Sequence, residues 1–168
     1  MKRMILTLVL SLMVTGMASA QNYMVVDSEK IFKSIPEYTQ ALESIDALAA
    51  DYQKAVDAKF QEVENLYNSY MQQRASLSES ARQQVENNIL QKEAEATEYQ
   101  ESLFGTDGEL MTKRLSLIQP IQDRVFKAIE NFSKLYGYDL VIDIAANPTV
   151  LYYSSKVDYT QQIINSLK

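Results

Sequence analysis

Residues 38–77 read YTQALESIDALAADYQKAVDAKFQEVENLYNSYMQQRASL, and this stretch decides the fold. Most positions at alternating steps of three and four are apolar or aromatic, which is the heptad pattern of helices that pair along a narrow seam. The seam positions are Leu42, Ile45, Ala49, Tyr52, Val56, Lys59, Val63, Leu66, Tyr70, Gln73 and Leu77. The pattern predicts one long helix whose seam is interrupted at Lys59 and Gln73.

The stretch after this helix predicts an antiparallel partner. SLSESARQQ, residues 76–84, reads as a turn in which Ser78 or Ser80 can cap a second helix. The return helix keeps the same period through Val85, Ile89, Lys92, Ala96, Tyr99, Leu103 and Leu110. Each helix alone would be marginal in water, so we expect the two to pair as a hairpin arm over residues 38–120.

Two features interrupt the return helix. Gly105 and Gly108 each cost about 1 kcal/mol relative to alanine inside a helix, and they predict a weak, bendable turn. Pro120 removes one backbone hydrogen bond and predicts a kink or a restart of the helix.

Short segments on both sides of the hairpin predict a β-rich oligomerisation body over residues 21–37 and 121–168. The predicted elements are strands over 23–27, 138–144 and 149–153, a short helix capped by Ser28, and a closing helix over 157–167. These elements bury too little apolar surface to be stable by themselves, so we expect the body to oligomerise. The candidate interface residues are Val26, Leu140, Ile142 and Val150. The expected fold class is mainly α with a small β body, in which a long antiparallel helical hairpin projects from a strand-containing base.

The first 20 residues have the parts of a secretory signal peptide. Lys2 and Arg3 precede the apolar run MILTLVLSLMV, and the small residues ASA at positions 18–20 precede a cleavage site. The run is short for a retained membrane anchor, which needs about 20 apolar residues. We therefore expect cleavage after Ala20 and a soluble mature chain without stable membrane insertion.

The composition argues against several classes of function. The chain has no cysteine and no histidine, so it lacks disulfides, the commonest general base and the commonest metal ligand. Its 22 acidic residues outnumber 16 basic residues, which argues against nucleic acid as a partner. Asp139 and Asp143 share a face of a predicted strand, but without histidine they predict no metal site. The sequence thus indicates a recognition surface, without catalytic residues or a cofactor-binding site.

Several stretches resemble the Skp family of periplasmic chaperones, also called the OmpH family. They are VVDSEKIFKSIPEY from Val25, the LSESAR turn, LIQPIQDRVFKAIENFSKLYGYDLVID from Leu117, and VLYYSSKVDYTQQIINSL from Val150. The resemblance covers the whole expected mature chain in order. Its most specific parts are VVDSEKIFKSIPEY, GYDLVID and VLYYSS, since the hairpin alone would match many coiled coils.

The resemblance implies a homotrimer in which one β-rich body, built from all three chains, carries three helical arms around a cavity. It implies that unfolded outer-membrane proteins are held in this cavity, in the periplasm, without ATP or another cofactor. The expected function is therefore an ATP-independent holdase that prevents the aggregation of these clients.

The charge of the arm departs from this resemblance. Residues 38–104 hold 5 basic and 12 acidic side chains, whereas well-known members of the family have basic arms. The acidic arm argues against lipopolysaccharide or an anionic membrane as a ligand. It could keep the trimer soluble or steer basic clients, although a solvated helix face is the simpler interpretation.

Apolar and aromatic groups beside the seam are the candidates for client contacts. The client-binding candidates are Phe60, Tyr67 and Met71. Aromatic rings can meet many apolar segments without a fixed register. For the seam tyrosines Tyr52, Tyr70 and Tyr99, packing between the two helices is the simpler interpretation.

A rival function is a structural or adaptor coiled coil of the cell envelope that docks one folded partner. Such an adaptor would bind one partner with a defined stoichiometry, whereas a holdase would protect several unfolded proteins. An enzyme is the third class, but a thin hairpin offers little of the concavity that an active site needs.

Overall fold

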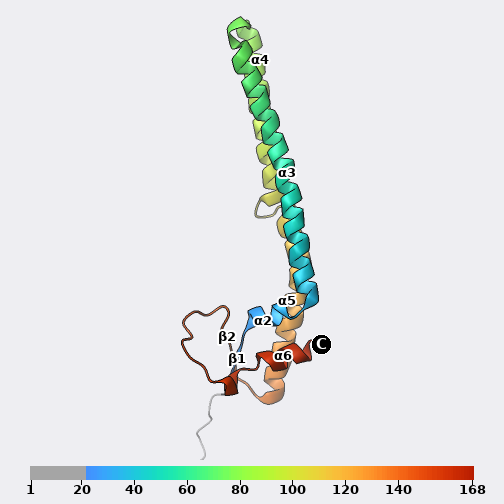
Figure 1. The fold of residues 1–168 in the computed structure, drawn as a ribbon, viewed down its shortest axis with the longest axis vertical. Coiled ribbons are helices and arrows are strands. Elements are labelled where there is room, and N and C mark those ends of the chain that lie inside the picture. Colours follow the sequence, from blue (N-terminus) through green and yellow to red (C-terminus); the bar gives the residue numbers. More distant parts are fainter. Residues whose placement is uncertain (1–21) are drawn as a thin grey trace, which may run out of the picture. The chain divides into compact units, whose positions relative to one another are not determined.

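The computed structural model describes residues 22–168, and the expected signal peptide, residues 1–20, lies outside the described residues. The chain divides into two compact units. We call residues 32–124 the arm unit, and residues 22–31 together with 125–168 the body unit. Figure 1 colours their elements in chain order, from β1 to α6.

Two long helices of the arm unit, α3 (Pro36–Gln73) and α4 (Glu79–Phe104), pack side by side (Figure 1). α3 begins at Pro36, where the missing N–H of proline leaves no hydrogen bond unmade. Every seam residue predicted from the heptads is buried or half-buried, except Gln73. Val56 on α3 and Ala96 on α4 are both only 1% exposed. The predicted long helical hairpin is confirmed.

Lys59, the other polar position in the seam of α3 besides Gln73, contacts an aromatic side chain. Its ammonium nitrogen lies 4.8 Å from the centroid of the Tyr99 ring, across the hairpin. A cation over the face of an aromatic ring is attracted by the quadrupole of the ring. The aliphatic stem of the lysine can meanwhile cover apolar surface of the seam, so the interruption does not break the pairing.

The turn of the hairpin consists of η2 (Arg74–Ser76), a short 3₁₀ segment, followed by the capped start of α4. Of the two serines that the sequence left open, Ser78 is the cap: its hydroxyl oxygen accepts the N–H of Ala81 at 3.3 Å. The side chain of Arg82 then donates from Nε to the carbonyl oxygen of Arg74 at 3.0 Å. These bonds satisfy backbone groups that helix ends leave without partners.

The two glycines of the return helix interrupt it, as predicted, whereas Pro120 does not restart it. α4 ends at Phe104 and α5 (Glu109–Tyr136) continues through Pro120 without a restart. A Cβ atom on Gly105 would lie 2.4 Å from the carbonyl oxygen of Glu101, and one on Gly108 would lie 2.8 Å from that of Leu103. The backbone therefore folds too tightly here for any larger residue.

The body unit is built around a two-stranded parallel sheet. β1 (Tyr23–Val26) pairs with β2 (Leu140–Asp143), with Tyr23 opposite Leu140 and Val26 opposite Asp143. Met24, Val25 and Val26 are at most 2% exposed. Such an apolar run is typical of a strand that is covered on both faces.

The second edge of β1 is covered by the C-terminal part of the chain. After η3 (Ser155–Val157), the N–H of Tyr159 donates to the carbonyl oxygen of Val25 at 3.0 Å. α6 (Thr160–Ser166) follows and buries Ile163 completely. The hydroxyl oxygen of Thr160 accepts the N–H of Asp27 at 2.9 Å, which ties the start of this helix to the end of β1.

The predicted third strand, residues 149–153, is wrong. These residues form no strand, and Leu151 and Tyr152 are 94% and 86% exposed. Both edges of β1 are occupied, by β2 and by residues near Asp158, and within residues 22–168 the segment does not pair with the remaining edge of β2 either. Pro148, just before the segment, also lacks a backbone donor.

The predicted cap of the first short helix is displaced by one residue. In α2 (Ser28–Lys33), the carboxylate of Asp27 accepts the N–H of Lys30 at 3.0 Å, so Asp27 is the cap and Ser28 is the first helical residue. Burial raises the pKa of Asp27, but the hydrogen bonds and the charge of Lys30 outweigh it and leave this pKa below its usual value. Ser28 does not cap this helix. Its backbone N–H donates to the carboxylate of Asp143 at 3.1 Å, which links α2 to β2.

Candidate functional site

The apolar side chains that the arm unit leaves in solvent are the first candidate for a binding surface. Phe60, Tyr67 and Met71 are 36%, 50% and 49% exposed, respectively. Sequence reasoning missed Leu90 on α4, which is 62% exposed. The sequence does contain a feature that could have identified Leu90. It directly follows the seam residue Ile89, so its side chain points out of the seam.

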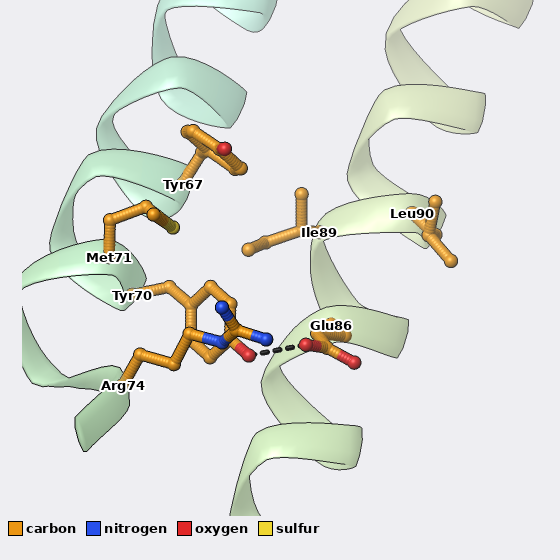
Figure 2. A pocket seen from close by; sticks show the side chains of 7 residues that line it. All are labelled: Tyr67, Tyr70, Met71, Arg74, Glu86, Ile89 and Leu90. Carbon is orange, nitrogen blue, oxygen red and sulfur yellow. Dashed lines mark hydrogen bonds between the residues drawn. The ribbon is translucent and has the colours of Figure 1, made fainter. Parts of the chain in front are cut away.

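Tyr67 and Met71 belong to one pocket near the turn of the hairpin, whereas Phe60 lies outside it. The pocket is open, with a volume of about 420 Å³. Its apolar lining comes from both helices: Tyr67 and Met71 on α3, and Ile89 and Leu90 on α4. Figure 2 shows Met71 and Ile89 directed toward the space between the helices, with Leu90 at the margin on the side of α4.

Three polar side chains complete the pocket at the end nearer the turn. The hydroxyl of Tyr70 donates a hydrogen bond to the carboxylate of Glu86 across the two helices, drawn as a dashed line in Figure 2. Arg74 lines the same end of the pocket. The bond to Glu86 raises the pKa of Tyr70, burial raises it further, and Arg74 opposes the shift. The phenol therefore remains a neutral donor at physiological pH.

The tyrosines of the seam pack within the arm unit. Tyr70 is only 6% exposed. The ring of Tyr52 meets Phe104 edge-on, with centroids 6.3 Å apart, and its hydroxyl donates to the carboxylate of Glu109 at 2.8 Å. Tyr99 lies under the ammonium of Lys59. Packing, which the sequence favoured for these three residues, is confirmed.

The body unit distributes the four predicted interface residues differently. Val26 is 1% exposed, so its side chain belongs to the core of the unit. Ile142 and Val150 are half-buried, and Leu140 is 56% exposed. Leu151 and Tyr152, which are not among the four predicted interface residues, are almost fully exposed.

The outer edge of β2 adds to this apolar surface. Within residues 22–168, the only strand that pairs with β2 is β1, which leaves the other edge of β2 without a ladder. An unpaired strand edge presents a row of N–H and C=O groups that can template pairing with another chain. The body unit therefore carries both backbone groups and apolar side chains that suit a partner.

Neither a cluster of metal ligands nor a membrane-spanning helix is found in the described part of the chain. Among residues 22–168, no three acidic side chains gather as ligands of a metal ion would. The carboxylate of Asp143 instead accepts from Ser28 and from the N–H of Ala145. None of the helices over this range combines the length and the apolar character that crossing a membrane requires.

Comparison with protein families supports the resemblance found in the sequence. A family model described as "Outer membrane protein (OmpH-like)" matches residues 22–167. The match includes both units and nearly every residue that the structure describes. A search of curated proteins finds no match.

Proposed function

The chain belongs to the OmpH-like family of periplasmic chaperones, and we propose that it acts as an ATP-independent holdase for unfolded outer-membrane proteins. In this proposal residues 1–20 are a signal peptide that is cleaved after Ala20. The mature chain forms a homotrimer, and its three arms enclose the client in a cavity. The family is one of chaperones and not of enzymes.

The observation that carries the proposal is the exposure of large apolar side chains on an otherwise polar arm. Phe60, Tyr67, Met71 and Leu90 leave apolar surface in solvent on α3 and α4. Three of these residues, Tyr67, Met71 and Leu90, line one pocket, and exposed apolar side chains gathered in this way are typical of an interaction site. Here it suits apolar segments of an unfolded client, which meet it through many weak contacts.

An unfolded outer-membrane barrel is a client that needs such contacts. Its strands alternate apolar and polar residues, and its unpaired strand edges promote aggregation. Covering the apolar side chains transiently would hinder association between clients. Release then requires no ATP, because folding into the membrane draws the free client away by mass action.

The trimer has support from the body unit. Leu140, Leu151 and Tyr152 are exposed, and the outer edge of β2 has no strand beside it in residues 22–168. A two-stranded sheet is marginal in water by itself. Pairing with other copies of the chain would extend the sheet and cover these side chains.

The decisive experiment measures the light-scattering mass of residues 21–168, alone and after a urea-unfolded outer-membrane barrel protein is diluted into them. The proposal predicts a trimer that takes up one client and suppresses its aggregation, and that also protects a second, unrelated barrel. A trimer that binds only one folded envelope protein would support the adaptor. A monomer would contradict the arrangement of arms around a cavity.

A further inference from the structure

The charge of the arm changes along its length, and the pocket of Figure 2 lies where it changes. Residues 67–90, around the turn, hold 2 basic and 2 acidic side chains. The parts of α3 and α4 farther from the turn, residues 38–66 and 91–104, hold 3 basic and 10 acidic side chains, and we call them the acidic shaft. A neutral, apolar pocket thus adjoins a strongly acidic shaft.

The size of the pocket suits a single large side chain. Its volume of about 420 Å³ lies at the small end of the range of about 300–1,000 Å³ for pockets that bind small ligands. Because the pocket is open on one side, a side chain can enter from an extended segment without threading.

The lining favours an aromatic side chain over an aliphatic one. The thioether of Met71 can make polarisable sulfur contacts with a ring. Arg74 can stack its guanidinium on the face of a ring. Glu86 already accepts from Tyr70, and a carboxylate has further lone pairs that can accept an indole N–H or a phenol O–H.

The acidic residues of the arm next to the pocket favour a client that carries basic residues beside its aromatic side chain. Glu64 lies three residues before Tyr67 on α3, and Glu93 lies three residues after Leu90 on α4, so each is one turn away on the side of the acidic shaft. A basic residue beside the bound ring would reach this field, whereas an acidic residue would be repelled.

We propose that this pocket binds an aromatic side chain of an unfolded client, in an extended segment that carries lysine or arginine next to the ring. The proposal rests on the holdase function and names the feature of the client that the turn end of the arm selects. It also assigns Leu90, which lies across the pocket from α3, to the same site as Tyr67 and Met71.

The test uses short peptides, since the chain has no tryptophan and the fluorescence of a tryptophan peptide is free of background. Residues 21–168 are titrated into GSKWKSG and into the matched peptide GSEWESG, and unlabelled GSKAKSG, which lacks the ring, is tested as a competitor of GSKWKSG. GSKWKSG is expected to bind most tightly. At low salt GSEWESG should bind at least about fivefold more weakly, and added salt should narrow this difference.

Two variants test whether the peptide binds in the pocket. Met71→Ser combined with Leu90→Ser removes two exposed apolar walls, and it should weaken the binding of GSKWKSG about tenfold or more. Leu115→Ser is the matched control, because Leu115 is 53% exposed and lies outside the pocket. It should change binding less than about twofold.

Each contrary outcome refers to a different claim. Equal binding of GSKWKSG and GSEWESG, displacement of GSKWKSG by GSKAKSG as effective as by GSKWKSG itself, or equal loss in Leu115→Ser would refute the pocket as the site. A change in the mass of the protein alone in the double variant would mean that a second copy of the chain occupies the pocket, which also refutes the proposal. A wild-type protein that binds GSKWKSG in the pocket yet leaves the unfolded barrel to aggregate would refute the holdase function instead.

Discussion

The arm unit and the body unit bury their apolar residues to different depths. α3 has 38 residues and buries four of them, Ala41, Ile45, Val56 and Tyr70, because a two-helix seam covers each helix on one side only. The helices and strands of the body unit are shorter than α3, yet the unit buries Met24, Val125 and Ile163 completely. A thin seam leaves apolar side chains dispersed in solvent, whereas a compact core leaves them at its edges. We therefore expect the arm to suit a disordered partner and the body to suit an ordered one.

The largest effect is expected from a charge at the exposed edge of the body. Ile142→Asp should convert the proposed trimer into monomers or aggregate, because an interface core does not tolerate an unpaired charge. Leu140→Asp should do the same with less effect on the unit itself, since Leu140 is already 56% exposed. Light-scattering mass and circular dichroism measure the two properties separately.

The arm offers the matched control for this prediction. Leu90→Asp places the same charge on a side chain of similar exposure, 62%, and it should leave the mass unchanged. A trimer that survives both Ile142→Asp and Leu140→Asp would refute the placement of the interface on β2.

The difference between the two units also explains what the sequence could predict. The hairpin follows from a local period, since the heptad positions specify which face of each helix is buried, and all but Gln73 of those residues are covered. The break at Gly105 and Gly108 and the cap near Ser78 also depend on neighbouring residues alone. Local patterns of this kind can be read without knowledge of the rest of the fold.

The errors concern features that depend on distant parts of the chain. Residues 149–153 have the composition of a strand, but a strand also needs a paired neighbour: residues near Asp158 take the second edge of β1, and within residues 22–168 the segment does not pair with β2. The burial of Val26 in the core of the body unit also depends on distant residues, and its predicted place at an interface stays a prediction. Leu90 joins Tyr67 and Met71 only because the pairing of α3 with α4 brings their positions together. Sequence periodicity does not contain this information.

The second prediction compares equal truncations in the two cores. Ile163→Ala should lower the free energy of unfolding of the body unit by about 3 kcal/mol, because a fully enclosed isoleucine leaves a cavity. Ile89→Ala should cost about 2 kcal/mol or less, because Ile89 borders an open pocket that solvent or neighbouring side chains can fill. Urea unfolding followed by circular dichroism measures both losses. Equal losses would mean that the seam is packed as fully as the body.

The third prediction concerns alkaline pH and an aromatic cluster of the body unit. Tyr138 and Tyr159 have ring centroids 5.0 Å apart, and Phe132 lies 5.6 Å from Tyr159. The hydrogen bond with Tyr159 and, next, burial raise the pKa of Tyr138 to about 12. In the unfolded chain this phenol titrates near its ordinary pKa of about 10.

The sign of the pH effect follows from these two values. Between about pH 10 and pH 12 the unfolded chain loses the proton of Tyr138 while the folded chain retains it. The contribution of Tyr138 to stability is therefore fully present below about pH 10 and is lost as the pH rises toward 12. Urea midpoints should fall less over this range in Tyr138→Phe than in the wild type. A parallel decline in both proteins would show that the other tyrosines and the lysines account for it.

The smallest effect on stability is expected at Lys59, a polar position of the seam. Lys59→Ala removes the ammonium that overlies the ring of Tyr99 at 4.8 Å, together with the aliphatic stem that covers part of the seam. A partly exposed cation–π contact contributes about 0.5–1 kcal/mol, so the free energy of unfolding of the arm should fall by about this amount. Lys54→Ala is the control, because Lys54 forms an ion pair with the exposed carboxylate of Asp51 at 3.3 Å, and surface ion pairs contribute little to stability. A loss in Lys59→Ala no larger than in Lys54→Ala would mean that the seam merely tolerates its lysine. A larger loss would mean that the arm, with so little buried surface, depends even on a single charged contact across its two helices.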